Sequence, residues 1–305
     1  MPSRLEGADL IDRVGGTPLV PIRGLADVPA GVEVLGKAEW LNPGGSVKDR
    51  AALAIVRAAE RSGALRPGGT ILDATSGNTG ISYAWIGARR GYRVRLCVPA
   101  NAGRARTRML TTLGAELVLT DPMEGTDGAV REARRLAAQA IEGVCYVDQY
   151  SNPANWRAHY HGTAEEIWRD TGGRVTHFVA GIGTSGTLVG AGRRLRELKP
   201  GLEVVAVQPD SPYHALEGLK HMPSALVPAI YDPSVHQRVI EVASEEAIEM
   251  AKRQGRLGLP LGASAGAAVV AAARVARALE RGLVVVVLPD SAERYLGDPL
   301  WEDPA

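Results

Sequence analysis

One lysine stands in a setting that could make it reactive. Lys48 follows Gly44, Gly45 and Ser46 in the stretch WLNPGGSVKDRAAL, and only five of the 35 lysine and arginine residues in the chain are lysines. The glycines permit a tight turn, and Ser46 is a good N-cap, so we expect Lys48 in the first turn of a helix. A helix N-terminus favours the neutral amine, which can act as a nucleophile or a base. A solvated surface lysine beside Asp49 is the alternative.

A second loop could bind an anion. The stretch DATSGNTGIS (residues 73–82) places serine, threonine, glycine and asparagine between an apolar strand and a helical segment. Backbone N–H groups, hydroxyls and an amide would converge there, which suits a carboxylate. An ordinary strand-to-helix turn with a capping residue is the alternative.

A third loop offers two interpretations. In AGIGTSGTLVG (residues 180–190), Gly181, Gly183 and Gly186 match G-x-G-x-x-G, and Asp210 falls where a ribose-binding acid would follow. This pattern alone suggests a dinucleotide such as NAD. The same loop also carries three hydroxyl residues, Thr184, Ser185 and Thr187. Hydroxyl donors instead favour a terminal phosphate, because a pyrophosphate relies mainly on close backbone approach.

The three loops together point to one cofactor. They supply a reactive lysine, an anion-binding loop and a phosphate cup, all expected where a strand leads into a helix. Pyridoxal phosphate needs a lysine for its imine and an anchor for its phosphate, and its amino-acid substrate needs a carboxylate site.

An alternation of strands and helices must position these loops. We expect strands at 32–39, 70–75, 92–99, 116–121, 144–148, 176–181, 202–208 and 283–290. Helix-length segments between most of them predict parallel sheets covered on both faces. The turn-rich segment 148–156 suggests a division near residue 150, and the irregular, proline-rich segment 209–236 suggests a functional loop or lid.

Composition excludes several classes of protein. The net charge is +1 over 305 residues, so no nucleic-acid partner is expected. Cys97 and Cys145 lie in apolar runs without CxxC spacing, and the six histidines show no metal-ligand spacing, so neither a disulfide scaffold nor a metal site is expected. The chain shows no signal-peptide core and no membrane-length apolar run. We therefore expect a soluble, cytoplasmic protein.

Six segments resemble a known family. In chain order, NPGGSVKDR, TSGNTGI, DQYSNPAN, GIGTSGT, GASAGAA and ERYL are similar to signature segments of cysteine synthases, which are fold-type II pyridoxal-phosphate enzymes of the tryptophan synthase β superfamily. The resemblance implies two three-layer α/β domains with mainly parallel sheets and the cofactor between them. The small domain would span 41–152, and the large domain would combine 1–40 with 153–305. Homodimers are usual in this family.

The resemblance also assigns roles to residues. Lys48 would form the imine with the cofactor, Asn78 would bond its 3′-oxygen, and Ser264 would face its pyridine nitrogen. The phosphate would be held by Gly183, Thr184, Ser185, Gly186 and Thr187. The substrate carboxylate would be held by Thr75, Ser76, Gly77, Thr79 and Gln149. A neutral hydroxyl at the ring nitrogen would suit expulsion of a β-substituent, whereas the simpler role for Ser264 is as the N-cap of the helix that follows.

The implied reaction replaces the β-substituent of an activated serine with a sulfur nucleophile to give L-cysteine. Lys220 lies in LKHMPSALVPAIYDP (219–233), which resembles the active-site loop of O-phosphoserine-using members that carry an arginine there. The resemblance leaves O-acetylserine and O-phosphoserine open as substrates, and sulfide and a carrier-protein thiocarboxylate open as sulfur donors. Cystathionine β-synthase chemistry on serine, an NAD-dependent oxidoreductase and a non-catalytic paralogue remain as alternatives.

Overall fold

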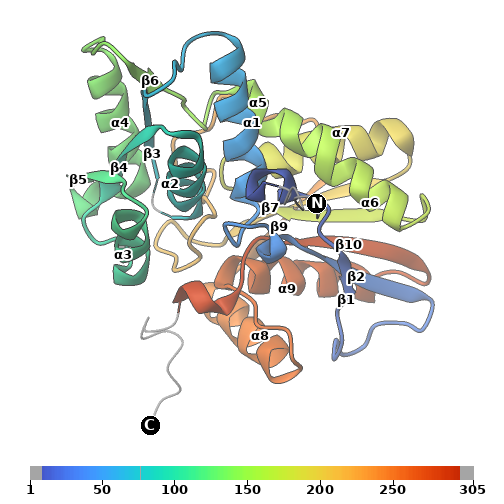
Figure 1. Cartoon of the computed structure of the whole chain (residues 1–305). Helices are drawn as coiled ribbons and strands as arrows, with labels where there is room; N and C mark the ends of the chain where they lie inside the picture. Colours follow the sequence, from blue (N-terminus) through green and yellow to red (C-terminus); the bar gives the residue numbers. More distant parts are fainter. Residues whose placement is uncertain (1–8, 76, 296–305) are drawn as a thin grey trace, which may run out of the picture.

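The computed structural model describes residues 9–75 and 77–295, whose strands form two sheets (Figure 1). The six-stranded sheet has the order β1-β2-β10-β7-β8-β9 and the four-stranded sheet the order β5-β4-β3-β6. The larger sheet consists of β1 (Leu19–Pro21), β2 (Val32–Ala38), β7 (His177–Gly181), β8 (Glu203–Pro209), β9 (Arg238–Val242) and β10 (Gly282–Leu288). The smaller consists of β3 (Thr70–Ala74), β4 (Arg93–Pro99), β5 (Glu116–Thr120) and β6 (Val144–Tyr146).

The strands pair in parallel except where β1 lies antiparallel to β2. All eight expected strands are present, which confirms the mainly parallel α/β fold. Strands β1 and β9 were not expected, and they form the two edges of the six-stranded sheet. Neither strand is buried on both faces, so neither carries the continuous apolar run by which the other strands were predicted. In β9 four of the five residues are not buried.

The six-stranded sheet is covered on both faces, and β10 shows how the sequence achieves this. Its side chains alternate, with Val284 and Val286 in the core against α8 and α9, and Val285 and Val287 in the core against α6 and α7. Each buried valine stabilises the fold by about 1.5–3 kcal/mol relative to an exposed one. The covering helices are α6 (Ala164–Asp170) and α7 (Gly186–Leu198) on one face, and α8 (Ser244–Arg256) and α9 (Ala263–Arg277) on the other.

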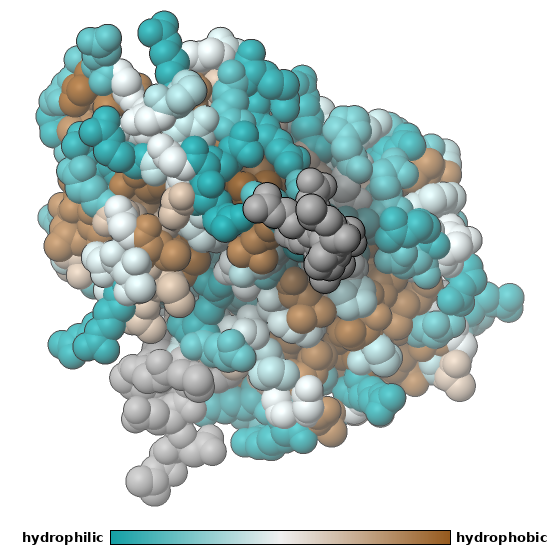
Figure 2. Space-filling model, in the orientation of Figure 1, coloured by the Kyte–Doolittle hydropathy of each residue, from teal (hydrophilic) through white to brown (hydrophobic). Residues whose placement is uncertain are grey.

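The four-stranded sheet has the same three-layer construction. Ile71 of β3 packs with α1 (Lys48–Arg61) and α2 (Asn78–Arg90), whereas its neighbour Leu72 packs with α4 (Gly125–Ala137). Helix α3 (Arg104–Thr112) lies beside β5. Exposed hydrophobic side chains gather at this edge of the sheet (Figure 2), and they include Met109, Leu119 and Met123.

Short helices complete the described chain. They are η1 (Leu10–Arg13), η2 (Glu39–Leu41), η3 (Pro122–Glu124), α5 (Pro153–Ala158), the π-helical turn η4 (His159–Thr163) and η5 (Ala292–Tyr295). Between β8 and β9 the chain is irregular over most of 209–236, as expected. The four-stranded sheet falls within the predicted small domain, 41–152, although the division into domains itself stays a prediction. Among the described residues, no helix has the length and apolar character needed to cross a membrane.

Candidate active site

The lysine loop is a turn that requires glycine. Gly45 has a φ of 76°, and a Cβ on Gly44 would lie 2.4 Å from the Asp49 carboxylate. Helix α1 begins at Lys48, so the expected position in the first turn is confirmed. The expected N-cap is wrong, because the capping position is Val47; the Ser46 hydroxyl still accepts a 3.3 Å hydrogen bond from the Lys48 backbone.

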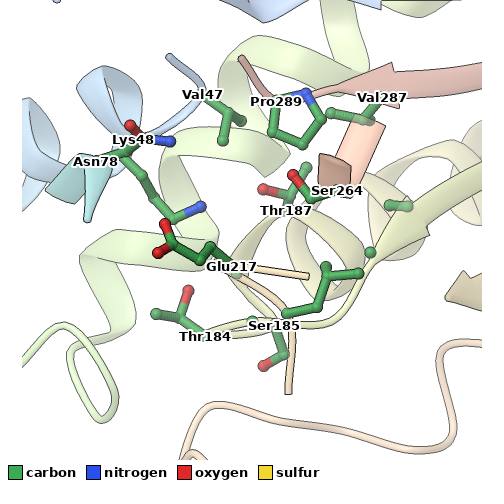
Figure 3. A pocket seen from close by; sticks show the side chains of 16 residues that line it. Val47, Lys48, Asn78, Thr184, Ser185, Thr187, Glu217, Ser264, Val287 and Pro289 are labelled. Carbon is green, nitrogen blue, oxygen red and sulfur yellow. The ribbon is translucent and has the colours of Figure 1, made fainter. Parts of the chain in front are cut away.

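The amine of Lys48 is directed into a pocket between the two sheets' loops, not to the protein surface (Figure 3). Its neighbour Asp49 does not pair with it. The buried Asp49 carboxylate instead accepts hydrogen bonds from Ser82, at 2.6 Å, and from the Trp85 indole, at 3.0 Å. The alternative, a solvated surface lysine beside Asp49, is therefore wrong.

Burial is the main cause of the altered acidity of Lys48. It lowers the pKa of the amine below the ordinary lysine value, and the nearby carboxylates Asp290 and Glu39 oppose this shift. The sequence suggested the same direction from the helix N-terminus, whereas the structure adds loss of solvent as the larger effect. A lowered pKa increases the fraction of neutral amine, which is the form that acts as nucleophile or base.

A buried ionic network fixes the helix that carries Lys48. Arg50, two residues along α1, donates to Glu39 at 2.7 Å and to Glu166 at 2.7 Å, and Lys37 donates to Glu166 at 2.6 Å. These side chains come from β2, η2, α1 and α6. Because removing one partner would leave an uncompensated buried charge, the network anchors α1 firmly to the larger sheet.

The loop predicted to bind the phosphate (residues 180–190), called the phosphate loop below, is a cup closed by tight packing. A Cβ on Gly183 would lie 2.1 Å from the Gly218 carbonyl, and one on Gly186 would lie 1.9 Å from the Asn155 amide oxygen. Ser185 is the N-cap of α7 in a left-handed conformation, with φ 69°. Its buried hydroxyl has no hydrogen-bond partner. An unpartnered buried hydroxyl at a helix N-terminus fits a phosphate oxygen, so this loop suits the cofactor that the sequence suggested.

Two neutral side chains hold the hydroxyls of this cup. Asn155 donates a 3.0 Å hydrogen bond to the Thr184 hydroxyl, and His159 Nε2 lies 3.2 Å from the Thr187 hydroxyl. The other ring nitrogen of His159 lies 2.9 Å from Thr163 Oγ1. Burial lowers the pKa of His159 to about 3, so the ring stays neutral at physiological pH.

The pocket joins the cofactor residues that the sequence predicted. It is lined by Val47, Lys48, Asn78, Ala180, Gly181, Gly183, Thr184, Ser185, Gly186, Thr187, Glu217, Gly218, Leu219, Ser264, Val287 and Pro289. Figure 3 shows the hydroxyls of Ser264 and Thr187 across the pocket from the Lys48 amine. The N-cap of α9 is Gly262, so the capping role considered for Ser264 is wrong and its hydroxyl lines the pocket. Asp210, the acid required by the dinucleotide interpretation, is exposed and lies outside the lining.

Asn78 is oriented by an acid to which the sequence pattern assigned no role. Its amide nitrogen donates a 2.6 Å hydrogen bond to the buried carboxylate of Asp290, which also accepts a 2.7 Å bond from the Tyr295 hydroxyl. The side-chain oxygen of Asn78 has no partner. Asp290 thus fixes the amide at the pocket wall, and it comes from the far end of the chain.

The loop predicted to bind the substrate carboxylate (residues 73–82), called the carboxylate loop below, is held by side-chain hydrogen bonds. The Thr75 hydroxyl accepts hydrogen bonds from the backbone of Gly77, at 3.1 Å, and Gly80, at 3.2 Å. Thr79 donates a 2.8 Å bond to Gln149, whose amide donates a 2.7 Å bond to the Ala74 carbonyl. The structure therefore brings Thr75, Gly77, Thr79 and Gln149 together. Ser76 lies outside the described residues.

An acid lies beneath this loop. Asp73 is fully buried at the end of β3 and accepts hydrogen bonds from the backbone of Ala74, at 2.8 Å, and Gln149, at 3.2 Å. Burial raises the pKa of its carboxyl to about 7. The position of Gln149 therefore depends on a group that changes charge near neutral pH.

Lys220 is placed outside the pocket lining. Its amine pairs with Asp127 of α4 at 2.6 Å and lies 5.4 Å from the centre of the Tyr150 ring. A substrate role for Lys220 stays a prediction. Glu217, Asn155 and His159 were not assigned roles from the sequence. Asn155 lies in the quoted segment DQYSNPAN, so a local signal existed, whereas nothing near Glu217 marks it.

Comparisons with known proteins agree with this site. Residues 10–290 match a family described as pyridoxal-phosphate dependent enzyme. A cysteine synthase of Aquifex aeolicus is 45% identical over 99% of this chain and 94% of its own, and cysteine synthase B of Pseudomonas aeruginosa is 40% identical over 96% and 97%. In both cases the similarity extends over nearly the whole length of both proteins.

Solved structures give the same result. A cysteine synthase from Entamoeba histolytica superposes with a TM-score of 0.91 at 33% identity, covering 100% of this chain and 94% of that one. An O-ureido-L-serine synthase also superposes at 0.91, with 36% identity and coverage of 98% and 97%. The chain therefore belongs to the family of pyridoxal-phosphate-dependent enzymes.

Proposed function

We propose that this protein is a cysteine synthase, which replaces the β-substituent of an activated serine with a sulfur nucleophile to form L-cysteine. The observation that carries the proposal is a single pocket that contains the Lys48 amine, its pKa lowered by burial, and a hydroxyl-lined cup with the unpartnered Ser185. Relatives named cysteine synthase that match nearly the full length support the choice of reaction.

Different residues of the pocket would contact different parts of pyridoxal phosphate. The cup from Gly183 to Thr187 would hold the phosphate, Asn78 would donate to the ring oxygen, and Ser264 would meet the ring nitrogen. When bound, the cofactor supplies an electron sink for negative charge at the substrate Cα. A neutral hydroxyl at that position would limit the sink and would favour loss of a β-substituent.

Lys48 would carry out the proton transfers. Its Nζ would take the proton from Cα as the β-substituent leaves. After the sulfur nucleophile adds to the β-carbon, the same Nζ returns the proton to Cα. The lowered pKa of Lys48 suits both steps, because an amine that titrates nearer to neutral pH exchanges a proton more readily.

The substrate carboxylate would bind at the start of α2. We assign it to Thr75, Ser76, Gly77, Thr79 and Gln149, and the helix N-terminus there favours a negative charge. The buried faces of Thr79 and Gln149 exclude water from this side. We assign Lys220 to the substrate entrance and not to direct contact, given its pairing with Asp127.

We further propose a cytoplasmic homodimer that uses sulfide or a thiocarboxylated carrier protein as sulfur donor. The family resemblance supports the dimer, and light scattering at several concentrations would test it. Pull-down with a thiocarboxylated carrier protein would test the second donor.

Product analysis tests the proposed function. The purified protein, loaded with pyridoxal phosphate, is given sulfide with either O-acetylserine or O-phosphoserine, and cysteine is quantified. We expect cysteine from at least one of them at a rate well above the protein-free reaction. Cystathionine from serine and homocysteine, with no cysteine from either activated serine, would favour the alternative chemistry.

A further inference from the structure

Lys48 and Asn78 are expected to contact neighbouring parts of the cofactor, although they come from different helices. Lys48 begins α1 and Asn78 begins α2, and both side chains line the pocket (Figure 3). In pyridoxal phosphate the aldehyde group and the ring oxygen are carried by adjacent ring carbons. The proposed function therefore requires the Lys48 amine and the Asn78 amide to keep a fixed position relative to each other.

Asp290 lies where both groups can be held. It follows β10 of the six-stranded sheet, whereas α1 and α2 pack on the four-stranded sheet. The carbonyl of Pro289 accepts a 2.9 Å hydrogen bond from the Val47 backbone, and Asp290 pairs with Ser46 in an isolated β-bridge. The Asp290 side chain accepts the 2.6 Å bond from the Asn78 amide. One short segment of the larger sheet therefore contacts both the lysine loop and Asn78.

The carboxylate of Asp290 determines which way the Asn78 amide points. The nitrogen and oxygen of an amide have nearly the same size, so packing alone hardly distinguishes its two orientations. A carboxylate only accepts hydrogen bonds, and the reverse orientation would place two acceptor oxygens against each other. Asp290 therefore keeps Nδ2 of Asn78 on its own side. Because Nδ2 carries two hydrogens, the same nitrogen can also donate to the ring oxygen of the cofactor.

This contact is buried, and its geometry is costly. Asp290 is 0% exposed, and a single oxygen, Oδ2, accepts from both Asn78 and the Tyr295 hydroxyl. The other oxygen, Oδ1, has no hydrogen-bond partner among the described residues. Leaving a buried carboxylate oxygen unsatisfied costs free energy, which packing alone would not require. The cost indicates that the carboxylate serves the orientation of Asn78.

We propose that Asp290 is a positioning residue for the cofactor: by holding the Asn78 amide, it directs an N–H group to the ring oxygen beside the carbon that Lys48 binds. Asp290 is not among the residues that line the pocket, so it acts through Asn78 and not by contact with the cofactor. The inference rests on the proposed function and adds to it a residue from the far end of the chain.

A double-mutant cycle measures whether Asp290 acts through Asn78. The affinity for pyridoxal phosphate is measured by equilibrium dialysis for wild type, Asp290→Ala, Asn78→Ala and the double variant. The visible absorption spectrum of each loaded protein is recorded, because a hydrogen bond to the ring oxygen alters the absorption of the bound cofactor.

Two further variants separate the hydrogen bond from other effects. Burial lowers the pKa of Lys48, and the charge of Asp290 opposes this shift, so the charge alone could influence binding. Asp290→Asn removes the charge but keeps an oxygen that can accept from Asn78. Tyr295→Phe is the matched control, because it removes the other hydrogen bond to the same carboxylate oxygen and keeps the ring.

We expect Asp290→Ala to weaken cofactor binding about tenfold, as for the loss of a hydrogen bond to a charged group. In the Asn78→Ala background the same change should cost at most about twofold, because the side chain through which it acts is gone. Asp290→Ala and Asn78→Ala should shift the absorption maximum in the same direction, with no further shift in the double variant. Asp290→Asn and Tyr295→Phe should each cost at most about threefold.

Equal losses from Asp290→Ala in the two backgrounds would overturn the inference, as would a loss from Tyr295→Phe as large as that from Asp290→Ala. If Asp290→Ala does not fold, Asp290→Ser takes its place in the cycle, because its hydroxyl is too short to reach Asn78. A wild type that does not bind pyridoxal phosphate would contradict the proposed function itself. A wild type that binds it and forms cysteine, but shows an additive cycle, would contradict this inference alone.

Discussion

The phosphate loop and the carboxylate loop have similar sequences, but different hydrogen bonds hold them in place. Each follows a strand of a parallel sheet and opens a helix, β7 to α7 in one case and β3 to α2 in the other. In the phosphate loop the Ser185 hydroxyl is unpartnered, and the loop rests on the neutral side chains Asn155 and His159. In the carboxylate loop the hydroxyls of Thr75 and Thr79 already bond within the protein.

The two loops also differ in the charged groups that lie near them. The phosphate loop is supported by a histidine that stays neutral, whereas the carboxylate loop lies over Asp73 and beside the ion pair of Arg106 and Glu217. A preformed cup with free donors suits a ligand that stays bound. In the carboxylate loop the hydroxyls already have hydrogen-bond partners, and the carboxyl of Asp73 beneath it can change charge. Such a loop suits a ligand that must enter and leave in every turnover.

The largest expected difference concerns pH. Asp73 has a folded pKa of about 7, above its unfolded value near 3.8. Its stabilising contribution is therefore complete below the unfolded pKa and is lost as pH rises through 7. Between pH 5 and pH 8, wild type should lose about 2–3 kcal/mol of unfolding free energy relative to Asp73→Asn.

Urea unfolding of both proteins at the two pH values measures this loss. If the difference in unfolding free energy between wild type and Asp73→Asn is the same at pH 5 and pH 8, then Asp73 does not titrate in this range and the prediction is wrong.

The next prediction tests the rigidity of the phosphate loop. Gly186→Ala would place a Cβ 1.9 Å from the Asn155 amide oxygen, so either the loop or the Asn155 side chain that bonds Thr184 must shift. Overpacking of this kind costs about 2 kcal/mol, which corresponds to roughly 30-fold weaker cofactor binding. Gly201→Ala is the control, because nothing lies within 4 Å of its Cβ position. Equilibrium dialysis with pyridoxal phosphate gives the two affinities, and equal values would contradict the tight cup.

The smallest expected effect is a change in substrate binding that leaves cofactor binding unaltered. Thr79→Val removes the 2.8 Å hydrogen bond to Gln149 and nearly preserves the shape of the side chain. We expect the KM of the amino-acid substrate to rise about fivefold, as for the loss of one hydrogen bond of about 1 kcal/mol, while cofactor affinity stays the same. Steady-state kinetics with cofactor titration would measure both. A parallel loss of cofactor affinity would mean that the two loops are not independent.

The sequence predicts the cofactor side of this molecule better than the substrate side. The strands, Lys48 and the residues of the phosphate loop could be predicted, because short-range patterns of glycines, hydroxyls and apolar runs specify them. The partners of Lys220 and Arg106 could not, because Asp127 and Glu217 are more than 90 residues away from them in the chain. No local pattern marks such pairs.

Two local expectations also failed for a physical reason. Ser46 and Ser264 are both good capping residues, yet Val47 and Gly262 occupy the capping positions. Each serine lies one or two residues from the cap, in a loop whose wider packing determines the helix start, and Ser264 lines the pocket. Capping preference is a small energy that such packing can exceed.

The central claim is that Lys48 carries the cofactor, and one measurement tests it most directly. Wild type and Lys48→Ala are incubated with pyridoxal phosphate, reduced with borohydride, digested and analysed by mass spectrometry, with the visible absorption spectrum recorded before reduction. We predict a yellow wild type labelled on the peptide that contains Lys48, and no covalent label in the variant. A label on another lysine, or a wild type that stays colourless with added cofactor, would contradict the account.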